Sequence, residues 1–160
     1  MATTPQDFTT GQVLTAAEMD MLPQGIIAMA TPITSNVGPT SSTTELDVIT
    51  APAVTPAQAG RRWRLRFHCK GIATTVADVQ FFLRIKEGGT TLGESNYKDL
   101  MSSNTAVATG GDFEAIVDSP SVAAHTYKVT IQRQVGTGNA TIAGSSTGPI
   151  LFYVEDVGAA

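Results

Sequence analysis

Residues 61–72 read RRWRLRFHCKGI, and this stretch decides the fold. Its odd positions carry the apolar side chains of Trp63, Leu65, Phe67 and Cys69. Its even positions carry the basic side chains of Arg62, Arg64, Arg66, His68 and Lys70. Because side chains of a β-strand alternate between the two faces of a sheet, the stretch predicts a strand with one apolar and one basic face. We expect the apolar set to lie in the core, with Cys69 as a buried thiol.

The basic face has two readings. It is either a patch for nucleic acid or an acidic partner, or a solvated sheet face whose charges pair across strands. Arginine in preference to lysine suits bidentate pairs with carboxylates, and few aromatic residues interleave to make a stacking platform. The net charge of −4 also argues against general nucleic-acid binding. We therefore expect cross-strand pairs or a protein contact at Arg62, Arg64 and Arg66, rather than nucleic acid.

The composition suits a β domain that packs against neighbours. The chain has 160 residues, enough for one domain with a core and a short arm. Only 15% of the residues are charged, so the polar surface must be built from Thr, Ser, Asn and Gln. The single cysteine excludes an internal disulfide and a cysteine-based zinc site. No run of about 18 apolar residues is present, so the sequence predicts no membrane-spanning helix.

Residues 1–23 are expected to form an arm and a short helix ahead of a β domain at residues 24–160. The first twelve residues are rich in threonine and carry one bulky anchor, Phe8. Thr15 and Glu18 form a capping box, and Pro23 ends the helix that follows. A helix this short is unstable alone, so its apolar residues need a surface. Two surfaces remain open, the domain's own end or a partner, for Leu14, Met19 and Leu22.

The rest of the chain alternates apolar and polar residues in short segments separated by turns. We expect strands near residues 25–31, 43–49, 61–72, 78–86, 112–118, 126–134, 140–146 and 149–156, and a loop at 31–42. In the second of these, Leu46 and Val48 should share a face. Eight or nine strands at regular spacing predict an all-β sandwich or jelly roll.

Two segments suggest contacts beyond the domain itself. Phe82 has the outward parity in its strand, where a large apolar side chain is a candidate interface residue. The last strand, PILFYVED at 149–156, is apolar on both faces, which predicts burial on both sides. It should be a central strand or one covered by another subunit, with Tyr153 as the candidate contact.

The sequence carries no constellation typical of catalysis. Residues 144–148 read GSSTG and match G-x-S-x-G, but they lie between two late strands with no helix following, so a hydrolase elbow is not predicted. The two histidines, His68 and His125, have no carboxylate or second histidine at ligand spacing. Phosphate-binding loops and paired-cysteine motifs are absent. We expect a protein that is not an enzyme and that binds no cofactor and no metal.

Five segments together resemble one protein family. They are GQVLTAAEMDMLPQGIIA at 11–28, GRRWRLRFHCKG at 60–71, FFLRIKEGGTTL at 81–92, HTYKVTIQRQVGTGNATI at 125–142 and ILFYVEDVG at 150–158. The family is a group of small virion structural proteins of tailed bacteriophages of actinobacteria, which open with a capped VLTAA..MN.LP.G element. Asp20 stands where that element has asparagine. The β body is also similar in pattern to trimeric jelly rolls of the tumour-necrosis-factor and complement-C1q kind.

The resemblance implies a protein on the surface of a virion, made in the host cytoplasm. The first expectation is a homotrimeric capsid decoration (minor capsid) protein of the head, anchored by its arm and helix on the major capsid protein. The alternative is a minor tail or fibre protein among other tail proteins, with a carbohydrate- or receptor-binding β domain that uses the polar loops around Asn36 and Asn96. Neither role involves nucleic acid or a membrane, and the family has no catalytic residues to carry over.

Overall fold

The structure is a computed structural model that describes residues 22–76, 79–98 and 109–160. Over these ranges the chain is all-β and forms ten strands. The strands are β1 (Gly25–Met29), β2 (Val37–Thr40), β3 (Leu46–Thr50), β4 (Arg61–Thr74), β5 (Gln80–Glu87), β6 (Thr90–Lys98), β7 (Thr109–Asp118), β8 (Tyr127–Val135), β9 (Ala140–Ala143) and β10 (Leu151–Ala159).

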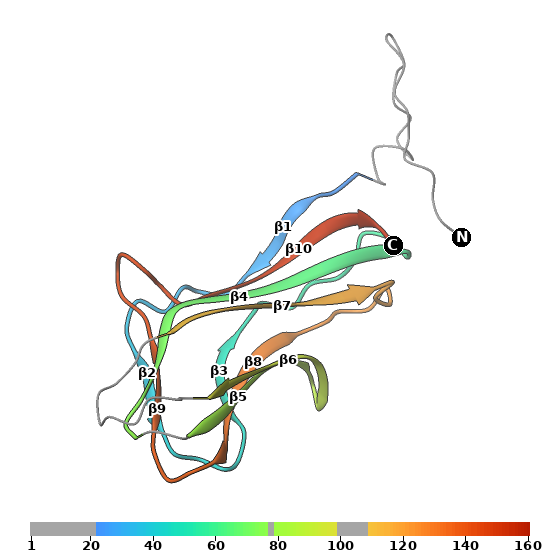
Figure 1. The fold of residues 1–160 in the computed structure, drawn as a ribbon. Helices are drawn as coiled ribbons and strands as arrows, with labels where there is room; N and C mark the ends of the chain where they lie inside the picture. The colour runs from blue at the N-terminus through green and yellow to red at the C-terminus, as the bar shows by residue number, and fades with distance from the viewer. Residues whose placement is uncertain (1–21, 77–78, 99–108) are drawn as a thin grey trace.

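The strands make two antiparallel sheets that face each other as a sandwich (Figure 1). In the six-stranded sheet, β4 pairs with β10 on one side and β7 on the other, β1 lies outside β10, and β9 and β2 continue from the far end of β4. The four-stranded sheet has the order β3-β8-β5-β6. The eight strands ordered β1-β10-β4-β7 and β3-β8-β5-β6 have the arrangement of a jelly roll, so the predicted fold class is confirmed.

Strand β4 organises the molecule. It is 14 residues long and forms backbone ladders with β7, β9 and β10. Burial alternates along it in the phase that the sequence indicates, and the side chains in the core are Trp63, Leu65, Phe67 and Cys69. Facing them from β5 are the buried side chains of Phe81, Leu83 and Ile85. Each such side chain contributes roughly 1.5–3 kcal/mol by leaving water, so this interlayer packing is a large part of the hydrophobic stabilisation.

Strand β2 lies inside residues 31–42, which the composition predicts as a loop, so that prediction is wrong for Val37–Thr40. The segment reads VGPT, and glycine and proline are typical of loops. Its partner defines it as a strand, since Val37 pairs with Ile142 and Thr40 with Ala140 on β9. Gly38 has φ +109°, and a Cβ there would lie 2.8 Å from the Ala140 carbonyl oxygen, so the close pairing requires glycine. Local composition does not report such a partner.

The alternation predicted for β3 is interrupted after Leu46, which the register places opposite the buried Ile131. Val48 and Ile49 are both buried, whereas Leu46 is exposed. The register of β3 against β8 shifts between Asp47 and Ile49, as a β-bulge does. Because of the extra residue, Ile49 lies opposite the buried Val129 and therefore on the same face as Leu46, and the alternation in the sequence does not show where the extra residue is inserted.

Strand β10 lies between β1 and β4, so it is an interior strand of its sheet. Phe152 and Val154 are fully buried, but Leu151, Tyr153 and Val157 on the other face are only partly buried. Within a single chain, the expectation of burial on both faces is therefore wrong. The outward face of this apolar strand stays partly open to solvent.

The predicted arm and helix fall almost wholly outside the described residues. This applies to Phe8, Leu14, Thr15, Glu18 and Met19. Leu22 is described, and it is exposed at a bend before β1 begins at Gly25. Within the three described ranges, no helix is long and apolar enough to cross a membrane.

Candidate interaction surface

The outward side chains of β4 form a ladder of ion pairs with the two neighbouring strands. Three of them reach β7 and one reaches β10, and each joins residues that the sheet register places directly opposite. The nitrogen–oxygen pairs are Arg62–Asp118 at 2.5 Å, Arg64–Glu155 at 2.8 Å, Arg66–Glu114 at 3.6 Å and His68–Asp112 at 2.5 Å. We call these eight residues the ion-pair ladder, and the sheet surface that carries them the ladder face. The structure thus has the cross-strand pairing that arginine at these positions favours.

Each of the three arginines in the ladder is paired with a carboxylate. The hydrogen bond to Asp118 raises the pKa of the Arg62 guanidinium, and the hydrogen bond to Glu155 raises that of Arg64. All four pairs are partly exposed, so solvent screens them and their contribution to stability is small. The basic residues of the ladder are therefore occupied within the chain, which favours the cross-strand reading over an open phosphate-binding patch.

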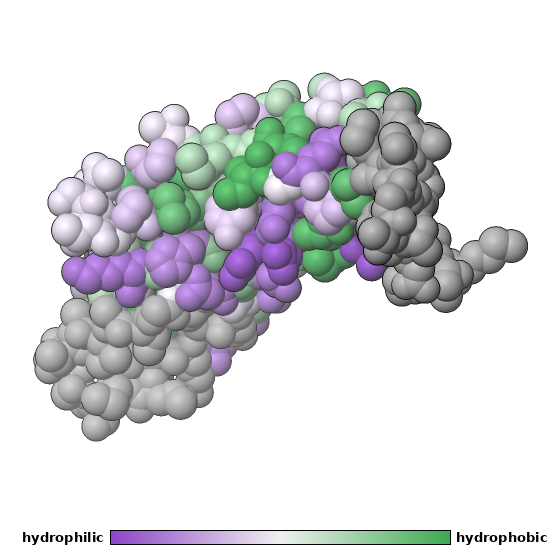
Figure 2. All heavy atoms as spheres, turned by 90° about the horizontal axis from the view of Figure 1, so that it is seen from above, coloured by the Kyte–Doolittle hydropathy of each residue, from purple (hydrophilic) through white to green (hydrophobic). Residues whose placement is uncertain are grey.

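Exposed apolar side chains flank the ladder on both sides. Ile26 and Met29 on β1 are exposed on one side, and Ile116 on β7 is exposed on the other. Met29 pairs in register with Tyr153, so an apolar strip crosses from β1 to β10. Seen from above, apolar patches lie beside a band of hydrophilic side chains (Figure 2). Methionine, tyrosine and arginine are enriched in protein–protein interfaces, and this combination marks the ladder face as a candidate contact surface.

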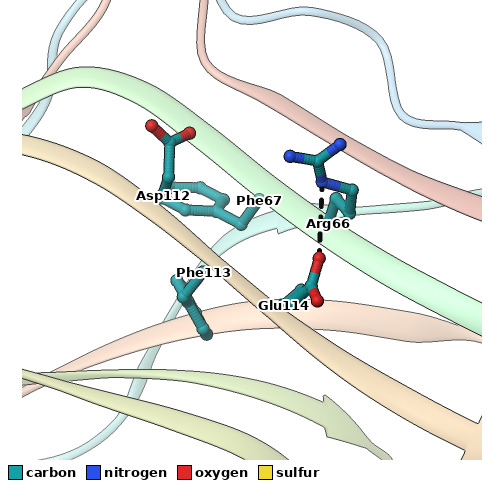
Figure 3. Close-up of a pocket in the computed structure, with 5 residues that line it drawn as sticks. All are labelled: Arg66, Phe67, Asp112, Phe113 and Glu114. Atoms are coloured by element: carbon teal, nitrogen blue, oxygen red, sulfur yellow. Dashed lines mark ion pairs between the residues drawn. The ribbon is translucent and has the colours of Figure 1, made fainter.

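A small pocket opens within this face between β4 and β7 (Figure 3). Its volume is about 200 Å³, and it is lined by Arg66, Phe67, Asp112, Phe113 and Glu114. It lies at the longest pair of the ladder, and the rings of Phe67 and Phe113 are 5.5 Å apart between their centroids. Pockets for drug-sized ligands measure roughly 300–1,000 Å³, so this one is smaller than such sites.

The opposite outer face, on the four-stranded sheet, has a different character. Phe82 points outward there, and the guanidinium of Arg84 lies 4.5 Å from its ring centroid. Arg84 also pairs with Glu45 at 2.7 Å and with Glu94 at 2.5 Å. Its cation–π contact with Arg84 gives Phe82 a partner within the chain. Phe82 and Tyr153, both predicted as interface residues, thus lie on opposite faces of the sandwich and cannot form one patch.

His125 belongs to a cluster that the sequence does not reveal. Its Nδ1 lies 2.5 Å from Glu87 Oε1, while its Nε2 lies 3.2 Å from Ser121 Oγ and 2.8 Å from the Ser121 carbonyl oxygen. These three residues have the composition of a serine hydrolase triad, but a triad histidine must accept a proton at Nε2. The carbonyl oxygen only accepts hydrogen bonds, so Nε2 is a donor here, and Nδ1 donates to the carboxylate. This arrangement suits the protonated ring, which acts as a clamp between Ser121 and Glu87.

The clamp joins the 119–126 loop to the end of β5. The ring of Trp63 meets His125 edge-on at 5.8 Å, and the ring of Tyr127 stacks on it at 6.0 Å. Burial lowers the pKa of His125, but the hydrogen bonds to the Ser121 carbonyl and Glu87, with the charge of Glu87, outweigh burial and raise it. The sequence shows no carboxylate near His125 because Glu87 lies 38 residues earlier and arrives through sheet pairing.

The other residues that the sequence singles out support loops or lie in the core, where the structure describes their side chains. Asn36 accepts a hydrogen bond from the Gly144 N–H at 3.2 Å, so its side-chain oxygen supports a loop, whereas the Asn96 side chain lies outside the described residues. Ser145 closes a tight turn on Gly148, its N–H donating to that carbonyl at 3.0 Å. Burial raises the pKa of the Cys69 thiol to about 11, which makes it unreactive.

Metal ligation also finds no support in the described ranges, where no group of three or more His, Cys, Asp or Glu side chains is placed to hold an ion. The ladder face is therefore the feature of the described chain with the clearest capacity for an interaction. Compared with known proteins, the sequence matches no family model and no curated protein.

Proposed function

We propose that the chain is a structural protein of a bacteriophage virion, most simply a trimeric decoration protein of the head. In this proposal, copies of the sandwich pack against one another through the ladder face. Residues 1–23 attach the assembly to the particle, where the partners are the major capsid protein or tail proteins. The role is not enzymatic and needs no cofactor.

The observation that carries the proposal is the ladder face. Its three arginines are already paired with carboxylates within the chain, so burying them on this face does not leave them without a counter-charge, which is the main cost of burying ionic groups. At the same time, Ile26, Met29 and Ile116 would leave water, at roughly 25 cal/mol for each Å² of apolar surface buried. A face of paired arginines with apolar strips is suited to a lasting contact between subunits. The resemblance of five sequence segments to virion proteins supports the particle as the site of assembly.

Deleting residues 1–23 tests the role of the N-terminal segment. The truncated protein should keep its sandwich, since the core strands begin at Gly25, but should no longer attach to particles. Quantitative blotting of purified particles measures the attachment, and circular dichroism of the truncated protein checks the fold. Undiminished attachment of a folded, truncated protein would contradict the proposal.

Immunogold labelling of intact particles separates the head from the tail. Gold over the head supports the decoration protein. Gold on the tail would instead favour the alternative, a minor tail or fibre protein with a carbohydrate- or receptor-binding domain, and a blank glycan array would then remove its carbohydrate-binding form. An absence of gold from every particle would refute a virion role altogether.

A further inference from the structure

Arg61, the first residue of β4, is a buried cation. Its side chain is 0% exposed, and it pairs with Asp156 of β10, which is also buried. Nε of Arg61 donates to Asp156 Oδ2 at 2.9 Å, and Nη2 donates to Oδ1. The Gly158 N–H donates to the same carboxylate at 2.9 Å. Burial tends to raise the pKa of Asp156, but the hydrogen bonds from Arg61 and Gly158 outweigh it, so the pKa is lowered and the carboxylate stays charged.

The guanidinium also reaches a third segment of the chain. Nη2 donates to the carbonyl oxygen of Leu22 at 2.8 Å, three residues before β1 begins. One side chain therefore ties together the start of β4, the end of β10 and the segment just before β1. The side chain of Leu22 is exposed, so its own burial does little to hold the backbone there.

Stability alone does not require this arrangement. Buried ion pairs replaced by apolar side chains of similar volume often leave proteins equally stable or more so. An apolar pair could not donate a hydrogen bond to the Leu22 carbonyl. The planar guanidinium holds a carboxylate with two of its donors and directs others in a set geometry, which a lysine ammonium cannot reproduce.

Backbone hydrogen bonds also hold the chain in place around Arg61. The Ser119 N–H donates to the Arg61 carbonyl at 2.8 Å, and the Ala160 N–H donates to the Gly60 carbonyl at 2.8 Å. The start of β1 and the C-terminus lie together at this end (Figure 1). The backbone around Arg61 is thus held by two other segments while its side chain holds the backbone of Leu22.

We propose that Arg61 is the positioning residue of the N-terminal segment, fixing the backbone at Leu22, where that segment joins the sandwich. The positioning itself rests on the described contacts, and its consequence for attachment rests on the proposed function. Without the hydrogen bond from Arg61, the backbone at Leu22 should become more mobile, while the β domain keeps its structure.

The test uses the full chain with spin labels at Leu22→Cys and Val135→Cys, diluted with unlabelled protein so that distances between copies do not contribute. Cys69 stays unlabelled because it is buried. The distance distribution should be narrow with Arg61 present and broad in Arg61→Met/Asp156→Leu. The matched control is a partly exposed ion pair on the other sheet, Lys128→Gln/Asp47→Asn, which should leave the distribution narrow. Arg61→Lys provides a second variant, since it keeps a charge beside Asp156 without the fork, and it should also broaden the distribution.

An unchanged distribution in the folded double variant overturns the positioning role, whatever happens to attachment. If the double variant does not fold, the distribution of Arg61→Lys decides in the same way. In Arg61→Met/Asp156→Leu, attachment to particles should fall by about ten-fold or more, because the free energy of one hydrogen bond to a charged group is lost. A broadened distribution with undiminished attachment would uphold the positioning role and count against the proposed function instead.

Discussion

Single residues in this molecule hold distant segments together through charge. His125 clamps the 119–126 loop to β5, and Arg61 joins the segment before β1 to β10. Both are cations paired with carboxylates that lie far away in the sequence. Their contributions to stability therefore depend on ionisation, and pH and substitution can test them separately.

The clamp at His125 should make stability depend on pH. The folded pKa is raised, so the contribution is fully present below the unfolded pKa of about 6.5 and is lost as the pH rises through the higher folded value. The groups that face the ring are Glu87, Tyr127 and Trp63. Urea unfolding should show the wild type exceeding His125→Gln most near pH 6 and converging with it towards pH 9. A difference that stays constant across this range would contradict the clamp.

Removing one partner of the buried pair should be costly. Asp156→Asn leaves the Arg61 guanidinium without its counter-charge in a fully buried site, and such losses amount to about 3–5 kcal/mol. Arg61→Met/Asp156→Leu removes both charges and should cost far less. Chemical denaturation of the two proteins at neutral pH compares them. Equal losses in both would mean that packing, and not charge, dominates this site.

At the scale of elements, the sequence predicts strands well where burial follows strict alternation and poorly where a partner defines the strand. The burial pattern of residues 61–72 can be predicted from the sequence, because apolar and basic residues alternate without interruption from Trp63 to Cys69 and the strand is long. Strand β2 is set by β9, and the bulge at Asp47 moves Val48 and Ile49 together into the core. The sequence predicts cross-strand ion pairs for the arginines of β4. It does not predict which carboxylates form them, because these lie on β7 and β10 and are set by the sheet register. The clamp of His125 likewise depends on which strands become neighbours.

The contact between β6 and β7 tests how closely the two layers pack. A Cβ at Gly93 on β6 would lie 2.9 Å from the Ala115 Cβ on β7, so Gly93→Ala should force the layers apart and cost about 1–3 kcal/mol. A Cβ at Gly89 in the preceding turn would meet no other atom within 4 Å, so Gly89→Ala is the matched control and should change stability by less than about 0.5 kcal/mol. Thermal unfolding of both variants measures the difference. Equal melting temperatures would show that the layers adjust freely.

At the scale of the whole molecule, the two outer faces of the sandwich differ in what they offer a partner. The face of the four-stranded sheet carries a charged network around Arg84 that also covers Phe82. The ladder face combines paired arginines with Ile26, Met29 and Ile116. The sequence predicts Phe82 and Tyr153 as apolar residues outside the core. It cannot show that they lie on opposite faces of the sandwich.

The most direct test of this account is the solution mass of the full chain, measured by light scattering, for the wild type, Ile116→Asp and Val135→Asp. Ile116 on the ladder face and Val135 on the other sheet are both 49% exposed, so the two substitutions are matched. We predict about three times the 16.7 kDa chain mass for the wild type and for Val135→Asp, and a single chain mass for Ile116→Asp. A wild type that stays monomeric at high concentration, or an Ile116→Asp variant that keeps the wild-type mass, would contradict assembly through the ladder face.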